Sequence, residues 1–245
     1  MTIGIYGLGR FGSFWAENLA KHFSVKGYSR SSIRPVPPGV LRVEEDEIFT
    51  CDTLILCNSI SSMPEVLARA ADRLRPGTLV MDTCSVKMYP LQLMAQRLPE
   101  TVYILGTHPM FGPDSAAGGL SGRPMILCPV RGTEELFQAW EDRFAALGLT
   151  IYRMTPEEHD REAAETQGIT HFIGRVLDDL NLRPSDIATL GYTRLLQIRG
   201  QTCNDPLQLY LDLQRFNPYT GGIRARLRDA IEKEMKRLDA EYPSP

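Results

Sequence analysis

The sequence predicts an α/β domain with a mostly parallel sheet, followed by an all-α C-terminal domain. Two observations support this division. Up to residue 153, short apolar runs alternate with helix-like stretches, and beyond it the strand-like runs stop. Near-continuous apolar strands separated by helices are typical of a parallel sheet that helices cover on both faces. We therefore expect one domain over residues 1–153 and a helical domain over residues 154–245.

Apolar runs and chain breakers place the elements of the first domain. Pro76 and Gly77 mark the return from a helix to the next strand. Residues 34–39 (RPVPPG) are expected to form a loop, because proline suits neither a helix interior nor a central strand, and they leave little room for a second crossover helix. Strands are expected at residues 3–6, 24–28, 53–57, 78–81, 102–105, 125–128 and 149–152. Helices are expected at residues 11–22, 63–74, 91–97 and 134–147.

A capped start predicts a long helix at the beginning of the second domain. Thr155 can be the N-cap, Pro156 suits the first helical position and Glu158 can close a capping box. This helix should run to residue 180, and further helices are expected at residues 184–201, 207–216 and 222–241. The last of them carries an apolar stripe opposite a charged face, made of Ile223, Leu227, Ile231, Met235 and Leu238.

The composition argues against several classes of partner. The net charge of -3 gives no reason to expect nucleic acid or an anionic membrane surface. No run approaches the ~18 apolar residues of a membrane helix, and the chain begins directly with a strand, so no signal peptide is expected. The five cysteines are scattered without metal-ligand spacing, which predicts reduced thiols, no metal site and a cytoplasmic location.

A glycine motif at the N-terminus predicts dinucleotide binding. An apolar run at residues 3–6 leads into Gly7-x-Gly9-x-x-Gly12 and then into a helical pattern, which is the strand–turn–helix context of a Rossmann-like fingerprint. The first glycine allows the tight turn, the second lets the backbone approach a pyrophosphate, and the third lets helix and strand pack closely. The alternative is a glycine turn in a domain that binds no nucleotide. The expected cofactor contacts are Gly7, Leu8, Gly9, Arg10, Phe11 and Gly12.

The end of the second strand favours NADP over NAD. An NAD site normally places Asp or Glu there to bind the ribose 2′-hydroxyl, but this strand ends in Tyr28-Ser29-Arg30-Ser31-Ser32 without a carboxylate. The planar guanidinium of Arg30, beside the hydroxyls of Ser29 and Ser31, matches a 2′-phosphate. If Arg30 is instead a solvated loop residue and the ribose is held elsewhere, NAD remains a candidate.

Polar residues follow two neighbouring strands. Ser85 and Lys87 come just after the strand that ends at residue 81, where ligands of parallel sheets gather, so both are expected to meet the substrate or the nicotinamide end. His108 lies in Gly106-Thr-His-Pro-Met-Phe-Gly112, a stretch expected to be a rigid loop that holds an imidazole able to accept a proton near neutral pH. The structural alternative is that Ser85 and Lys87 merely begin a helix and that the histidine is a packed residue.

The helical domain adds further candidates. His159-Asp160-Arg161 lies near the start of the first helix, and Gln167 and His171 share one face of it because they are four residues apart. Arg194 lies in the next helix, whereas His22 is assigned to an exposed helix end in the first domain. Exposed charge is the usual role of arginine and stands as the alternative for Arg194.

These segments together resemble the prephenate/arogenate dehydrogenase family of tyrosine biosynthesis. The resemblance covers most of the chain, and no fused mutase or regulatory domain accompanies it, so tyrosine feedback through an added domain is not expected. It implies NAD(P)-dependent oxidation of arogenate or prephenate with loss of CO2 and aromatisation, and, with the apolar stripe, a homodimer formed through the helical domain. The matching segments are Asp82-Thr-Cys-Ser-Val-Lys87, His108-Pro-Met-Phe-Gly-Pro113, His159-Asp-Arg, Gln167-Gly-Ile-Thr-His-Phe172, Tyr192-Thr-Arg194 and Leu209-Tyr210.

The resemblance also implies residue roles. His108 is expected to form a hydrogen bond with the 4-hydroxyl of the substrate and to act as general base. Ser85 is expected to bond the same hydroxyl or to orient His108. Arg194 is expected to bind a substrate carboxylate, although Arg199 is an alternative because the match is loose in this region. His171, and Gln167 one helical turn earlier, are expected to line the substrate pocket.

Two other readings compete with this one. A β-hydroxyacid dehydrogenase-type reductase shares the two-part layout, but it uses a lysine of the helical domain as acid or base. Here the helical domain has only Lys233 and Lys236, both on the last amphipathic helix. A non-catalytic NADP-sensing protein is the second alternative, against which the joint presence of His108, Ser85 and Arg194 counts.

Overall fold

The computed structural model describes residues 1–31 and 33–241, and the chain forms two compact units. The first unit comprises Met1–His159 and the second Asp160–Pro245, so the boundary falls inside helix α6 (Pro156–Ala163). The hydroxyl of Thr155 accepts from the Glu158 amide at 3.2 Å, and the Glu158 carboxylate accepts from the Thr155 amide at 2.8 Å, which confirms the expected capping box.

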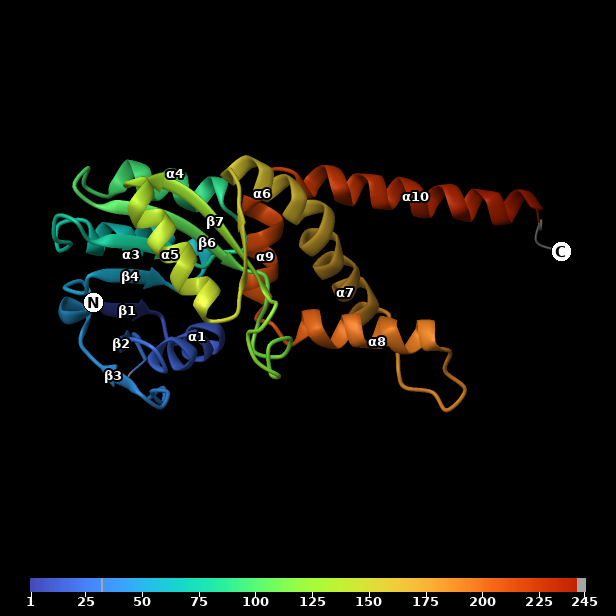
Figure 1. The fold of residues 1–245 in the computed structure, drawn as a ribbon. Coiled ribbons are helices and arrows are strands. Elements are labelled where there is room, and N and C mark those ends of the chain that lie inside the picture. The colour runs from blue at the N-terminus through green and yellow to red at the C-terminus, as the bar shows by residue number, and fades with distance from the viewer. Residues whose placement is uncertain (32, 242–245) are drawn as a thin grey trace. The chain divides into compact units, whose positions relative to one another are not determined.

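An eight-stranded sheet with the order β3-β2-β1-β4-β5-β6-β7-β8 forms the first unit over its described residues (Figure 1). Every neighbouring pair is parallel except β6 and β7, which confirms the mostly parallel sheet. The strands are β1 (Thr2–Tyr6), β2 (Ser24–Tyr28), β3 (Val40–Arg42), β4 (Thr53–Leu56), β5 (Leu79–Asp82), β6 (Tyr103–Pro109), β7 (Pro124–Arg131) and β8 (Thr150–Arg153).

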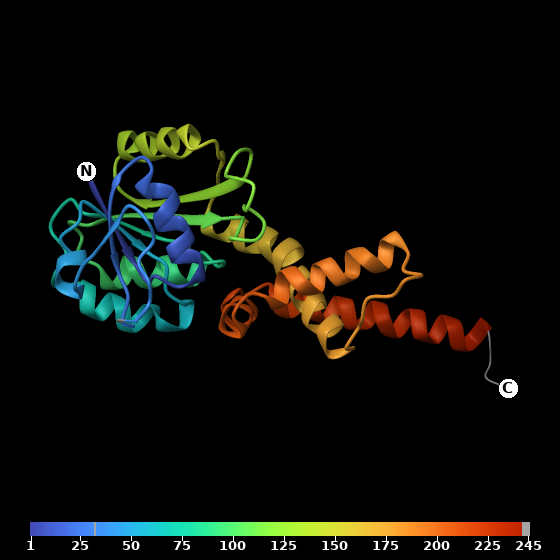
Figure 2. The ribbon, with the colours of Figure 1, turned by 90° about the horizontal axis from the view of Figure 1, so that it is seen from below.

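Helices cover both faces of this sheet. Figure 2 shows α1 and α5 on one face and α3 and α4 on the other. On the first face Trp15 of α1 packs against Phe144 of α5, with ring centroids 6.0 Å apart, over the buried side chains of Ile3 and Ile5. This packing fixes α1 against β1 and hence the turn between them. The helices of this unit are α1 (Arg10–Ala20), α2 (Glu45–Ile48), α3 (Met63–Ala70), α4 (Met88–Arg97) and α5 (Glu134–Ala146), with a 3₁₀ turn at Ile60–Ser62.

The loop expected at residues 34–39 is confirmed, and over its described residues the chain between β2 and β4 holds only the four-residue helix α2 in place of a full crossover helix. It also holds a short strand, β3, which the sequence did not predict. Neither element has an apolar run of its own, and Leu41 at the centre of β3 is exposed. Strand β6 also continues to Pro109, because the antiparallel strand β7 pairs His108 with Ile126. His108 is therefore a strand residue and not a loop residue.

The second unit is helical throughout its regular structure. The long helix expected to residue 180 is continuous but contains a π-helical segment, Ala164–Gly168, between α6 and α7 (Ile169–Asp179). Helix α8 (Leu190–Cys203) begins later than expected, because the Thr189 side chain caps it by accepting from the Tyr192 amide. Helices α9 (Leu207–Phe216) and α10 (Thr220–Glu241) follow. Across the described residues, no helix combines the length and apolar composition needed to span a membrane.

Candidate active site

The turn between β1 and α1 has the features of an anion-binding site. Gly7 has a φ of +106°, which disfavours any side chain, and a Cβ on Gly12 would overlap the carbonyl oxygen of Gly7. Gly9 is the N-cap of α1, and neither a capping side chain nor an acidic residue occupies the first turn. The first amides of the helix and its positive dipole end are thus available to a pyrophosphate.

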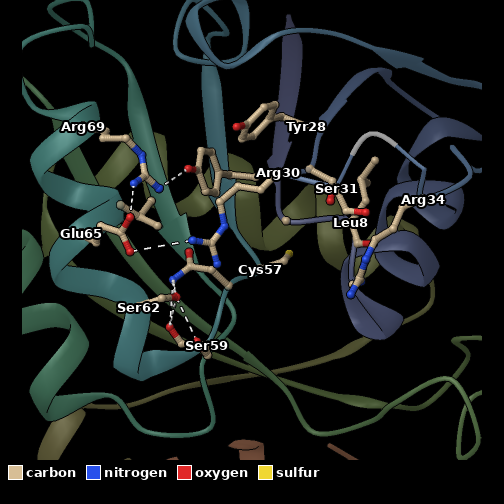
Figure 3. Close-up of a pocket in the computed structure, with 16 residues that line it drawn as sticks. Leu8, Tyr28, Arg30, Ser31, Arg34, Cys57, Ser59, Ser62, Glu65 and Arg69 are labelled. Atoms are coloured by element: carbon tan, nitrogen blue, oxygen red, sulfur yellow. Dashed lines mark hydrogen bonds and ion pairs between the residues drawn. The ribbon is translucent and has the colours of Figure 1, made fainter.

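A cavity of about 310 Å³ lies over this turn (Figure 3). The residues expected to bind the cofactor divide into two groups around it. Arg10, Phe11 and Gly12 belong to the first turn of α1 instead of the lining, and Arg10 is paired with Asp114 at 2.5 Å. Ser32 lies outside the described residues. The expected residues that line the cavity are Gly7, Leu8, Gly9, Ser29, Arg30 and Ser31.

Three arginines line this cavity among the described residues, against one carboxylate, Glu65. Arg30 reaches toward Glu65 on α3, with 3.9 Å between Nη1 and Oε2, whereas Arg34 lies beside the start of α1 and donates from Nη1 to the Leu8 carbonyl at 3.2 Å (Figure 3). Arg69 donates to Glu65 at 2.5 Å. Sequence reasoning missed Arg34 because the surrounding prolines marked only a loop.

A buried phenol holds Arg69 in place. Tyr6 donates to Glu45 at 2.5 Å and accepts from Arg69 at 2.8 Å. Burial, together with the Glu45 hydrogen bond, raises the pKa of Tyr6 to about 12, so the phenol keeps its proton at neutral pH. Burial likewise raises the pKa of Cys57 to about 12, which leaves a neutral thiol beside the cavity.

A buried carboxylate links the ends of β5 and β6. Asp82 pairs with Gly106 in the strand register and accepts from the backbone amides of Cys84 at 3.0 Å and Thr107 at 3.2 Å. It also forms an ion pair with Lys87, and both side chains are completely buried. Lys87, expected to meet the substrate, therefore contributes to the scaffold beneath the site. Ser85, also buried, follows the same strand and lies at the same edge of the sheet as His108.

His108 is fixed by a second histidine. Its Nδ1 lies 2.8 Å from Nε2 of His159, and the two rings meet at an interplanar angle of 67°. Both side chains are buried, with 3% and 2% exposure. The sequence placed His159 in a segment of interest but assigned it no role, because its contact with His108 crosses 51 residues of chain.

Several buried polar side-chain atoms of the second unit have no hydrogen-bond partner among the described residues. Among them are Oε1 of Gln167, in the π-helical segment, and Nδ1 of His171, in α7. Burial lowers the pKa of His171, with Arg175 acting in the same direction and Asp205 against it, which favours a neutral imidazole. Buried polar atoms are almost always paired, so these two mark a place where a ligand can complete the hydrogen bonding.

The arginines of this unit differ in how far they are already engaged. Arg194 is exposed on α8. Arg199 donates to the Leu182 carbonyl and lies 3.9 Å from Asp178. Arg175, which the sequence reasoning missed, donates to the Asp205 carbonyl at 3.1 Å, stacks over Tyr210, and has a buried Nε without a partner among the described residues.

Comparison with known proteins places the chain in a family. Residues 39–153 match the nucleotide-binding domain of prephenate dehydrogenase, and residues 176–243 match the TYRAAT1-like C-terminal domain. Chloroplastic arogenate dehydrogenase 2 of Arabidopsis thaliana is 34% identical over 97% of this chain and 70% of its own length. The chain belongs to the prephenate/arogenate dehydrogenase family. Chloroplastic arogenate dehydrogenase 1 of the same plant is 37% identical over 89% of the chain, which spans 36% of that relative.

Solved structures agree with this family at the level of the fold. Prephenate dehydrogenase from A. aeolicus, in complex with hydroxyphenyl propionate and NAD+, matches with a TM-score of 0.73 at 18% sequence identity. The match covers 98% of this chain and 91% of that chain. The chain therefore shares with that structure a fold that has a mostly parallel sheet and a helical C-terminal part.

Proposed function

We propose that the chain oxidises arogenate or prephenate with a nicotinamide cofactor, releasing CO2 and forming an aromatic ring. One observation carries this proposal beyond family membership: His108, near the end of β6, and Ser85, just after the neighbouring strand β5, lie at the sheet edge that also bears the glycine turn and its cavity. Ligands of such sheets bind at the carboxyl ends of the strands. A proton acceptor and the expected dinucleotide-binding turn therefore lie at the same edge of the sheet.

His108 acts as the general base. A bound dinucleotide would supply the hydride acceptor. His108 takes the hydroxyl proton as the C–H electron pair of the same carbon departs as hydride, which leaves a carbonyl. When CO2 leaves, the electron pair of the broken carbon–carbon bond enters the ring, which becomes aromatic. The former carbonyl oxygen then regains the proton from His108 as a phenolic hydroxyl. Ser85 bonds the same oxygen or orients the imidazole.

The second unit supplies substrate contacts in this proposal. Gln167 and His171 offer their unpartnered polar atoms to the substrate. Arg194 binds a carboxylate; its exposed guanidinium makes it a better candidate than Arg199, which is engaged with Leu182 and Asp178.

We assign NADP as the preferred cofactor. Arg30 extends from the end of β2 beside Ser29 and Ser31, and no carboxylate of β2 occupies the place of a ribose 2′-hydroxyl partner. Arg34 adds a second guanidinium to the same cavity. Two guanidinium groups and adjacent hydroxyls suit a 2′-phosphate better than a neutral ribose.

We further propose a homodimer in the cytoplasm. Three side chains of the apolar stripe on α10, Ile231, Met235 and Leu238, are 52%, 61% and 60% exposed within a single chain. Covering this stripe with a second copy would remove apolar surface from water. The cytoplasmic location stays a prediction from the cysteine pattern, and all five cysteines are free thiols.

Absorbance of the reduced nicotinamide tests the activity. The chain is mixed with arogenate or prephenate and with NADP or NAD, and His108→Asn serves as the matched inactive variant. We expect turnover with one of the two substrates, faster with NADP, and a loss of about 10²–10⁴ in kcat for His108→Asn with unchanged cofactor affinity. Absence of turnover with every combination, or reduction of a β-hydroxyacid's keto partner instead, would overturn the proposal.

A further inference from the structure

The hydrogen bond between His108 and His159 constrains which ring nitrogen of His108 carries a proton, because both partners are imidazoles. A hydrogen bond between His108 Nδ1 and His159 Nε2, at 2.8 Å, needs one proton between the two nitrogens. If His108 donates, its Nε2 carries a lone pair. If His159 donates, a neutral His108 must carry its proton on Nε2, where it cannot accept another.

Both rings are held by regular structure. His108 lies in β6, paired with Ile126 of β7. His159 lies in the first turns of α6, where its amide donates to the Thr155 carbonyl at 3.0 Å, within the capping box. Two buried rings on two rigid elements keep the nitrogen pair in register without a substrate present.

We propose that His159 is a positioning residue that selects the proton-accepting tautomer of His108. His159 accepts the Nδ1 proton of His108, which leaves the Nε2 lone pair of His108 for the substrate hydroxyl. This inference rests on the proposed function for its kinetic consequence, whereas the tautomer is a property of the protein alone.

The same contact stabilises His108 after it has taken the proton. The O–H bond of the substrate breaks and an N–H bond forms at His108 Nε2, so His108 becomes an imidazolium. Its Nδ1–H bond to neutral His159 then becomes a charge-assisted hydrogen bond, which is stronger than a neutral one. Because this partner is an imidazole and not a carboxylate, it brings no fixed negative charge to His108, and the proton can return to the substrate oxygen after CO2 has left.

Nitrogen-15 NMR of the full chain tests the tautomer without substrate or cofactor. Only four histidines are present, so His22→Gln and His171→Gln variants assign the remaining two ring systems. We expect His108 to carry its proton on Nδ1 at mildly alkaline pH, to keep it there in His159→Gln, whose amide oxygen can accept, and to lose this preference in His159→Phe. A wild-type His108 protonated on Nε2 overturns the proposal, even if His159→Phe does not fold.

Kinetics give the second readout. We expect His159→Phe to lower kcat roughly 10- to 100-fold, a share of the ~10²–10⁴ that a general base contributes, with both KM values nearly unchanged. His159→Gln should recover most of this loss, and His22→Phe, at an exposed position, is the control. Wild-type kcat in folded His159→Phe contradicts the proposal. A chain inactive toward both substrates refutes the proposed function instead, and the NMR result then decides the tautomer alone.

Discussion

Arg30 and Glu65 face each other in the cofactor cavity, with 3.9 Å between a guanidinium nitrogen and a carboxylate oxygen. Both side chains are largely exposed, at 68% and 61%. An exposed pair at this distance is weak, typically worth about 0–1 kcal/mol. Arg30 can therefore exchange its contact with Glu65 for one with a doubly charged phosphate at little cost in free energy. Two predictions about cofactor choice follow from this contact.

The first prediction concerns Arg30 itself. Arg30→Ala should weaken binding of NADP about tenfold or more and leave NAD nearly unchanged, because only NADP has the phosphate that the guanidinium would bind. Calorimetric titration of each oxidised cofactor measures the two Kd values. Arg75→Ala, at an exposed position outside the cavity lining, is the matched control. An equal effect on both cofactors would refute the 2′-phosphate assignment.

The second prediction concerns Glu65. Glu65→Gln removes the carboxylate that competes with phosphate for Arg30 and repels it, so NADP should bind up to roughly fivefold more tightly. NAD affinity should stay within about twofold, since NAD lacks the phosphate. The same titration measures this, with Asp72→Asn on the exposed surface beyond α3 as the control. Weaker NADP binding in Glu65→Gln would show that the carboxylate contacts the cofactor instead.

The third prediction concerns the buried ion pair of Asp82 and Lys87. Lys87→Met leaves an uncompensated carboxylate in the interior and should lower the free energy of unfolding by about 3–5 kcal/mol. Lys26→Met breaks the partly exposed pair with Glu47 and should cost at most about 1 kcal/mol. Urea titrations of the three proteins measure the difference. Equal stability losses would mean that Lys87 does not neutralise Asp82 in the folded chain.

The fourth prediction concerns His171 and pH. Burial lowers its pKa in the folded chain, so below the unfolded value of about 6.5 the unfolded chain binds a proton that the folded chain does not. The free energy of unfolding should therefore decrease as pH falls from about 6.5 toward the folded pKa, with a slope of up to about 1.4 kcal/mol per pH unit from this group.

His171→Asn should flatten this dependence, as measured by urea titrations over a range of pH. His22→Asn, at an exposed helix end, should leave the dependence in place. A pH dependence identical in wild type and His171→Asn would show that the imidazole of His171 is not shielded from water in solution.

Local signals made much of the first unit predictable. Gly7 and Gly12 predict the turn between β1 and α1 because the backbone there needs glycine at two positions only five residues apart. The capping box of Thr155 and Glu158 likewise predicts the start of α6 from residues three apart. The missed features depend on contacts between distant segments. Strand β3 exists because Val40 pairs with Val25, and the pairing with Ile126 keeps His108 within a strand.

The candidate site was predictable by residue type and less so by arrangement. Ser29, Arg30 and Ser31 line one cavity as expected, but Arg34 joins them from a stretch that showed only its prolines. Lys87 and Ser85 both follow the same predicted strand, so nothing in the sequence separates their roles. The buried ion pair with Asp82 shows that the ammonium group of Lys87 belongs to the scaffold. No local spacing relates His159 to His108.

Strand β7 runs against its neighbour, and this reversal has an evolutionary consequence. His108 is held by its pairing with Ile126 of β7, while the pairing of β6 with β5 ends at Gly106, and the segment from residue 110 to residue 123 begins only after β6 ends. Exchanges at the exposed positions of this segment can therefore accumulate without displacing the imidazole, whereas Phe111 and Ala116 are buried in the core. Descendants of this scaffold are free to diversify what they admit to the site while inheriting the same proton chemistry.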